Sequence, residues 1–279
     1  MSFSPYPPSL FEAKYLLRKP EKAQLLEAIR NHVKSSDAAV IQSIPKTDHY
    51  VLDGGSLLHR LKWKEGSTYS SIADNYSSFT IKLYGKATVV FDGYNGRPST
   101  KDNTHLRRRS SVANNVNIRE ATQFVVKMQD FLANETNKQA IINFIADCLR
   151  QIGCHVIHAE GDADVDIVKA AVEMSSYKST TLVGKDTDLL VLLLHHAASD
   201  CKDLYFRSDK DKVKSYVYNI KVLKQLLGDD VCSDLLFAHA FSGCDSTSGI
   251  YGVGKKSIFQ KIINIISGDP VFHSCSKIF

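Results

Sequence analysis

The sequence lacks the features that mark several large protein classes. Its 279 residues include six cysteines and one tryptophan, and no cysteines stand in a C-x-x-C pair or at zinc-ligand spacing. The longest wholly aliphatic run, residues 189–194, is far shorter than the roughly 20 residues that cross a bilayer. The first residues show no charged segment followed by an apolar one, so we expect no signal peptide. These absences favour an intracellular protein, nuclear or cytoplasmic, with reduced thiols and no membrane partner.

The composition is that of a folded domain with little surplus charge. Hydrophobic residues make up 43% and charged residues 23% of the chain, which excludes a disordered tail, a disulfide-stabilised miniprotein and a fibre. A chain of this length buries a sizeable core in one large domain or two small ones. Its 35 basic and 30 acidic residues give a net charge of +5. That mild surplus permits nucleic acid as a partner but does not require it.

Apolar runs alternate with helical patterns from about residue 48 onward. The candidate strands are residues 50–52, 87–91, 154–157, 181–183 and 189–194. Apolar residues between 141 and 152 recur at helical spacing, and Gly153 ends that helix. Continuous apolar strands that alternate with helices predict an α/β fold, with a mostly parallel sheet covered on both faces. Residues 1–45 form an N-terminal appendage that is helical in part, and residues 46–279 form the main domain.

Aspartates follow the apolar runs. Asp53 and Asp92 end the first two runs, and the later acids come in short motifs: Asp162 and Asp164, Asp186 and Asp188, and Asp245. Because ligands of parallel sheets bind outside the carboxyl ends of the strands, we expect these seven carboxylates to gather at that edge. Gathered carboxylates repel one another unless cations offset their charge. Hard ions with oxygen ligands, Mg²⁺ or Mn²⁺, suit such a site better than zinc.

Each aspartate taken alone has a simpler interpretation. An aspartate after a strand is commonly a turn residue or a helix N-cap, and Asp53 and Asp162 both precede an expected helix. The neighbouring Glu160 and Asp166 are open to the same choice between a metal ligand and a solvated surface residue. Five such segments together are explained better by one shared site than by separate caps.

Five segments in this order resemble the motifs of the flap endonuclease/XPG group of PIN-like nucleases. They read VLDGGSLL at 51–58, VVFDG at 89–93, AEGDAD at 159–164, KDTDLL at 185–190, and FSGCD with GIYGVGKK at 241–245 and 249–256. The resemblance extends over about residues 50–262. It implies a PIN-like, Rossmann-like fold with a helical arch inserted at about residues 94–135 and a helical hairpin at about 235–266. The family places its first acid near the start of the chain, whereas residues 1–45 precede the domain here.

The activity implied by the resemblance is that of a Mg²⁺-dependent, structure-selective nuclease. It would hydrolyse phosphodiester bonds of DNA, with RNA as the alternative, by means of two Mg²⁺ or Mn²⁺ ions. The expected products carry 5′-phosphate and 3′-hydroxyl ends, and branched or single-stranded DNA is the expected partner. The expected metal ligands and catalytic acids are Asp53, Asp92, Asp162, Asp164, Asp186, Asp188 and Asp245. The family usually has glutamate where Asp162 and Asp164 stand. Aspartate is one methylene shorter, so its carboxylate reaches less far toward a metal ion.

The resemblance also implies phosphate contacts in the arch. Lys101 and Arg108 lie at the spacing of the arch residues that contact the scissile phosphate in the family, and we expect both to be catalytic. Arg107 and Arg109 complete a basic run whose guanidinium groups suit phosphate oxygens. Such a run is also typical of a solvated basic face or a localisation signal.

A second phosphate contact is expected at the helical hairpin. Gly252 and Gly254 form a turn before the helix that starts with Lys255 and Lys256. Free N–H groups at such a turn hold a phosphate directly or through a bound K⁺. An ordinary glycine-rich turn is the alternative.

Two other functions fit parts of the sequence. A PIN-like module without catalysis would bind nucleic acid or a protein, because folds persist after their chemistry is lost. A phosphatase of the haloacid type needs a D-x-D motif near the start of the domain, and neither Asp53 nor Asp92 begins one. The nuclease therefore remains the favoured hypothesis.

Overall fold

The computed structural model describes residues 5–19, 21–43, 45–93, 113–209, 216–245 and 247–268. By their contacts the described residues divide into two compact units. The first, here called the sheet unit, comprises the described residues of 45–185 and 201–215. The second, the helical unit, comprises those of 1–44, 186–200 and 216–279.

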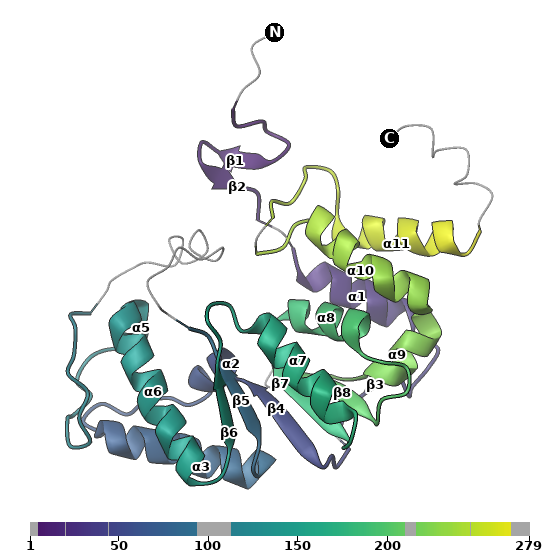
Figure 1. Cartoon of the computed structure of the whole chain (residues 1–279). Coiled ribbons are helices and arrows are strands. Elements are labelled where there is room, and N and C mark those ends of the chain that lie inside the picture. The colour runs from purple at the N-terminus through teal and green to yellow at the C-terminus, as the bar shows by residue number, and fades with distance from the viewer. Residues whose placement is uncertain are drawn as a thin grey trace. The chain divides into compact units, whose positions relative to one another are not determined.

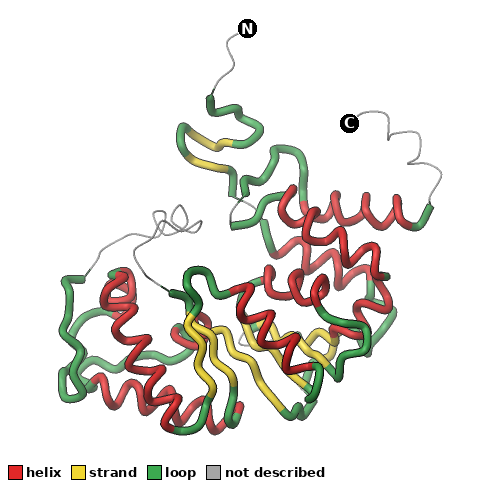
Figure 2. Tube along the Cα trace, viewed as in Figure 1, coloured by secondary structure: helices red, strands yellow, loops and turns green. Residues whose placement is uncertain are grey.

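The sheet unit is built on a parallel sheet. Its strands lie in the order β6 (His155–His158), β5 (Thr88–Phe91), β4 (His49–Asp53), β7 (Thr180–Gly184) and β8 (Leu204–Ser208). Each strand pairs in parallel with its neighbour, and Figure 2 shows them in yellow. This confirms the predicted α/β class and the four strands expected at residues 50–52, 87–91, 154–157 and 181–183.

Helices cover this sheet. They are α2 (Gly54–Leu58), α3 (Tyr69–Tyr84), α5 (Met128–Ala133), α6 (Glu135–Gln151) and α7 (Asp164–Ser175). Leu52 and Val89 belong to a core cluster with α3 and α6. The alternate residues Val51 and Val90 point to the other side of the sheet, where α7 packs against β4, β5 and β7 (Figure 1). The predicted stripe lies on α6, and Gly153, at φ +85°, follows its end.

Two glycines allow backbone segments to approach closely beside the sheet. A Cβ atom on Gly54 would overlap the Phe91 ring and the carbonyl oxygen of Val90. One on Gly93 would overlap the carbonyl oxygen of Ala159, and the Gly93 N–H donates to Gly161 over 2.9 Å. Both glycines adjoin a predicted site aspartate, so close packing fixes the backbone at Asp53 and Asp92.

The helical unit gathers helices from distant parts of the sequence. They are α1 (Ala23–His32), α8 (Thr187–His196), α9 (Ile220–Leu227), α10 (Asp229–Phe241) and α11 (Lys255–Ile266). The unit also holds two antiparallel strand pairs, β1 (Phe11–Ala13) with β2 (Leu16–Leu17) and β3 (Val40–Ile41) with β9 (Val217–Asn219). Helix α1 buries Leu25 and Ile29 and packs against α11. Among the described residues no helix combines the length and apolarity needed to cross a membrane.

The strand suggested for residues 189–194 is wrong. These residues lie within helix α8, which begins after the N-cap Asp186. A short apolar run has no periodicity that separates a buried strand from a buried helix. Leucine is a good helix former, and the Asp186 side chain accepts a hydrogen bond from the Asp188 N–H at the helix start. That cap decides in favour of the helix.

We predict that Tyr76→Phe destabilises the sheet unit by about 1–3 kcal/mol. The buried Tyr76 hydroxyl donates to the Leu58 carbonyl over 2.6 Å and accepts from Trp63 Nε1 over 2.9 Å. Loss of the hydroxyl leaves both groups unpaired. Urea unfolding measures the change, with Tyr177→Phe as the matched control because Tyr177 is 70% exposed. Equal unfolding midpoints for the two variants would contradict this account.

Candidate functional site

Three of the predicted aspartates meet in the helical unit. Asp186 is the N-cap of α8, Asp188 lies in the first turn of that helix, and Asp245 follows α10. Their carboxylates each offer an oxygen, and these oxygens all lie within 4.8 Å of one another. The aspartate set predicted from the sequence therefore includes three residues that the fold brings together, from segments that are about 60 residues apart in the chain.

The ammonium group of Lys22 lies among these three carboxylates. Its Nζ atom is 2.8 Å from Asp188 Oδ2, 2.8 Å from Asp245 Oδ2 and 3.4 Å from Asp186 Oδ2. The Lys22 side chain is only 15% exposed. Burial alone would lower the pKa of Lys22, but Asp186 and Asp188 outweigh it and raise the pKa well above its usual value. The ammonium is thus firmly charged and offsets repulsion within the cluster.

A second set of buried polar groups lies on the other side of Asp188. His239 Nε2, on α10, is 2.9 Å from Asp188 Oδ1. Lys255 Nζ lies 3.2 Å from His239 Nδ1 and donates to Ser242 Oγ over 3.2 Å. Burial acts to raise the pKa of Asp188, but His239 and Lys22 outweigh it and hold the pKa well below its usual value. Burial lowers the pKa of Lys255 to about 8.

The donor set of this cluster fits a hard divalent cation. Carboxylate oxygens are the ligands that Mg²⁺ and Mn²⁺ prefer, and three of them converge on one position. Lys22 shows that this position already binds positive charge. Asp186, Asp188 and Asp245 are therefore the residues that would hold such an ion in the helical unit.

Asp53 and Asp92 meet in the sheet unit. Asp53 ends β4 as the N-cap of α2, and its Oδ1 accepts from the Ser56 N–H over 3.0 Å. Asp92 follows β5, and its Oδ1 accepts from the Ala163 N–H over 3.0 Å. Both carboxylates lie beside Gly55, since a Cβ there would be 3.2 Å from Asp53 Oδ1 and 3.6 Å from Asp92 Oδ2. Burial and the nearby Asp92 charge raise the pKa of Asp53.

The pair Asp162 and Asp164 lies at the start of α7. Asp162 is exposed, and its Oδ1 accepts from the Asp164 N–H over 3.3 Å. Asp164 is half-buried and is the first residue of the helix. Glu160 is exposed and Asp166 half-buried. The Ala163 N–H at this helix start is bound by Asp92, so β5 and the α7 N-terminus are joined through a carboxylate.

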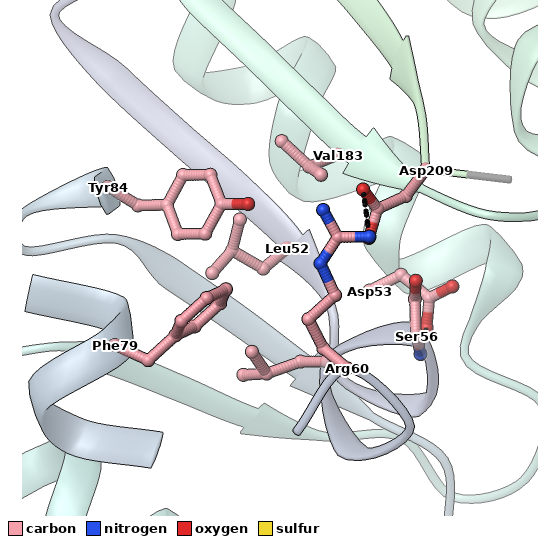
Figure 3. Close-up of a pocket in the computed structure, with 9 residues that line it drawn as sticks. Leu52, Asp53, Ser56, Arg60, Phe79, Tyr84, Val183 and Asp209 are labelled. Carbon is pink, nitrogen blue, oxygen red and sulfur yellow. Dashed lines mark hydrogen bonds and ion pairs between the residues drawn. The ribbon is translucent and has the colours of Figure 1, made fainter. Parts of the chain in front are cut away.

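A small pocket opens beside Asp53 in the sheet unit (Figure 3). Leu52, Phe79 and Tyr84 give it an apolar wall. On its other side Arg60 Nη1 lies 2.8 Å from Asp209 Oδ1. Since Asp209 takes up the charge of Arg60, the pocket itself offers little net positive charge to a ligand. Burial raises the pKa of Asp209 against the opposing effect of Arg60.

The predicted phosphate-binding residues differ in whether the structure describes them and in how exposed they are. Lys101, Arg107, Arg108 and Arg109 lie outside the described residues. Gly252 and Gly254 are exposed, with Gly252 at φ +78°, and Lys256 is exposed and pairs with Glu27 over 2.8 Å. Lys255 is buried, with 2% of its surface exposed. Its ammonium therefore faces His239 and Ser242 rather than solvent.

Sequence reasoning missed three residues of the helical-unit site: Lys22, His239 and Ser242. Lys22 lies in the segment expected to be an appendage, 166 residues before Asp188, and no local pattern links the two. His239 and Ser242 lie at the end of α10, beside or within the FSGCD motif. Their nearness to the acid of that motif is the one signal that the sequence offers.

No family profile matches the chain, and no curated protein matches it either. Solved structures do match. The catalytic core of Rad2 in complex with DNA substrate is 15% identical, with a TM-score of 0.49, and the match covers 84% of this chain and 65% of that one. A mutant T5 5′-exonuclease is 14% identical, with a TM-score of 0.43, and the match covers 78% of this chain and 72% of that one. Human GEN1 in complex with Holliday junction DNA is 15% identical, with a TM-score of 0.44, and the match covers 81% of this chain and 51% of that one.

These three matched proteins are nucleases of the flap endonuclease/XPG type. The chain spans about 65% of the length of the Rad2 core. Because the identities are near 15% and the TM-scores lie below 0.5, we transfer no residue role from these structures.

We predict that Asp188→Asn lowers the free energy of unfolding at pH 7 by about 1–3 kcal/mol. The pKa of Asp188 is lower in the folded than in the unfolded chain, so the unfolded chain binds more protons in acid. The stability that Asp188 contributes is present above about pH 4 and is lost as the pH falls. The difference between wild type and variant should therefore shrink below about pH 4.

Denaturant unfolding at a series of pH values without divalent ions measures this difference. Asp37→Asn is the control, because Asp37 is exposed. A stability difference for Asp188→Asn that stays constant from pH 7 to pH 3 would contradict the prediction.

Proposed function

We propose that this chain is a divalent-metal-dependent nuclease that hydrolyses phosphodiester bonds in branched or single-stranded DNA, with RNA as the alternative. One observation carries the proposal: Asp186, Asp188 and Asp245 converge on a single cation-binding position. A cluster of three carboxylates is costly to hold together unless it serves to bind a cation. Metal sites of this kind serve the hydrolysis of phosphate esters, and nucleic acid is the substrate of this class that we propose.

In the proposal seven aspartates supply the ligands of two metal ions. The ligands are Asp53, Asp92, Asp162, Asp164, Asp186, Asp188 and Asp245. Contacts within the sheet unit support its part of this set. The Lys185 backbone hydrogen-bonds to the Asp53 carboxylate. Asp92 and Asp162 are linked in turn through the first residues of α7.

The chemistry divides between the ions and the chain. Divalent ions held there would activate water and stabilise the leaving oxygen of an in-line displacement, giving 5′-phosphate and 3′-hydroxyl ends. The aspartates hold fixed positions because capping bonds restrain Asp53 and Asp186. His239, supported by Lys255, orients the Asp188 carboxylate from its buried side.

Basic groups outside the acid cluster would bind the phosphate backbone. We assign this role to Lys101, Arg107, Arg108 and Arg109, with Lys101 and Arg108 closest to the scissile phosphate. The exposed turn at Gly252 and Gly254 supplies backbone N–H groups, with K⁺ as an intermediary, and Lys256 adds a surface charge. The burial of Lys255 supports a positioning role toward His239 instead.

The alternative is a PIN-like module that binds nucleic acid or protein without cleaving it. The ion pairs of Lys22 favour it, because the ammonium already offsets charge in the acid cluster. We propose a nuclear or cytoplasmic location for either function. Among the described residues, Cys148, Cys154 and Cys232 carry free thiols, which is consistent with a reducing compartment.

Purified protein with Mg²⁺ or Mn²⁺ should cleave branched or single-stranded DNA, and Asp186→Asn should reduce the rate by at least ~100-fold. The substitution removes a charged oxygen from the metal position while leaving an N-cap residue. Labelled substrates with a flap, a bubble, a single strand or an RNA strand are compared on a denaturing gel.

Asp37→Asn, an exposed residue in the same unit, is the matched control and should cleave like wild type. EDTA should abolish cleavage by all active forms. Cleavage by wild type no faster than by Asp186→Asn, together with metal-independent DNA binding, would overturn the nuclease in favour of the non-catalytic module.

Replacing Arg107, Arg108 and Arg109 together with alanine should weaken DNA binding uniformly across sequences. Each lost phosphate contact reduces the slope of log affinity against log salt by about 0.9 for duplex DNA and 0.7 for single strands. Fluorescence anisotropy in Ca²⁺ or EDTA, where cleavage is prevented, measures the slope. The control replaces Lys62, Lys64 and Lys82, which are exposed in the sheet unit. Equal slopes for the two triple variants would refute the assignment.

A further inference from the structure

We propose that Lys22 is part of the metal site, where its ammonium holds the position of a divalent ion and must leave when that ion binds. The proposal rests on the metal-binding part of the proposed function. It gives residues 1–45, which the sequence presents as an appendage, a direct part in the chemistry of the helical unit.

The same carboxylates serve both cations. The cluster that could hold a metal ion consists of Asp186, Asp188 and Asp245, and Lys22 Nζ lies within 3.4 Å of an oxygen of each. An ammonium has three N–H donors and no acceptor, so three surrounding carboxylates satisfy it. A divalent ion would draw on oxygens of the same three carboxylates at a shorter distance, near 2.0–2.1 Å for Mg²⁺. One position cannot hold both.

Charge also favours exchange over joint binding. Without a metal ion, three clustered carboxylates need nearby positive charge, which Lys22 supplies. Once a doubly charged ion occupies the cluster, an ammonium at hydrogen-bond distance from the same oxygens would be repelled. His239 contacts Asp188 at its other oxygen, Oδ1, and can remain in either state.

The position of Lys22 in the fold allows such an exchange. The residue stands immediately before α1, whose Leu25 and Ile29 are buried in the helical unit. The backbone at Lys22 is therefore anchored, while its flexible four-carbon side chain has several bonds about which it can turn once the ion pairs break. The side chain keeps 15% of its surface exposed, so it borders on solvent.

Exchange makes metal affinity a competition. Each ion that enters must replace the ion pairs of Lys22, so the chain binds divalent ions more weakly than its three carboxylates alone would. Lys22 thereby sets the metal concentration at which the site fills. A residue with a purely structural role would affect stability but would not weaken metal binding.

Mn²⁺ binding to the full chain tests the proposal without any need for activity. The free Mn²⁺ signal in electron paramagnetic resonance gives apparent Kd values for wild type, Lys22→Met, Lys22→Gln and the control Lys34→Met. Lys34 is exposed and lies just beyond the end of α1, and its replacement by methionine changes the net charge as much as Lys22→Met does. We expect both Lys22 variants to bind Mn²⁺ at least about tenfold tighter than wild type, equal to ~1.4 kcal/mol. The control should match wild type.

Thermal unfolding provides a second readout. Metal-free Lys22→Met should melt below wild type, because its carboxylates lack a counter-charge, and Mn²⁺ should raise its Tm by more than that of wild type. If neither Lys22 variant folds without metal, refolding in Mn²⁺ but not in NaCl of equal ionic strength supports the proposal. Failure to refold in Mn²⁺ overturns it.

The outcomes separate this proposal from the function on which it rests. Folded Lys22 variants that bind Mn²⁺ no tighter than wild type overturn the exchange while leaving the metal site intact. Absence of Mn²⁺ binding in wild type and in every variant overturns both the exchange and the metal-dependent nuclease.

Discussion

The parallel pairing of β4 with β5 is the constraint on which the candidate chemistry of the sheet unit depends. The register places Asp53 opposite Val90, two residues before Asp92. Because the two strands run in the same direction, both end at the same edge of the sheet. Both carboxylates therefore lie beside Gly55. An antiparallel arrangement would place these acids at opposite ends of the strands. The burial that raises the pKa of Asp53 follows from the same close packing.

Four strands and one long helix of the sheet unit were predictable from local sequence patterns. Strands β4, β5, β6 and β7 are short apolar runs whose neighbours are turn residues, and α6 carries an apolar stripe that ends at Gly153. An acid that follows each strand in the sequence reaches the same edge of the sheet if the strands are parallel. The convergence of Asp53 with Asp92 therefore follows from local patterns and strand direction together. So does the capping role of Asp53, since that residue type favours the first position before a helix.

The remaining site features depend on contacts between distant segments. Nothing around Lys22 indicates that its ammonium meets Asp188 and Asp245, because that contact is set by how α1 packs in the helical unit. Lys255 has a glycine-rich turn before it, which suggested exposure to phosphate, yet the fold turns its side chain inward toward His239. The run at 189–194 became a helix because a cap, and not its hydrophobicity, determines its conformation.

The helical unit draws on three separated stretches of the chain, and this order has a consequence during synthesis. Lys22 and Asp188 are 166 residues apart. At about 5–20 residues per second, the acid leaves the ribosome on the order of 10–30 s after the lysine. For that interval α1 presents Leu25 and Ile29 without the helices that bury them in the finished unit. The apolar face of the nascent amino-terminal segment therefore stays uncovered until the carboxylate partners of its lysine have been made.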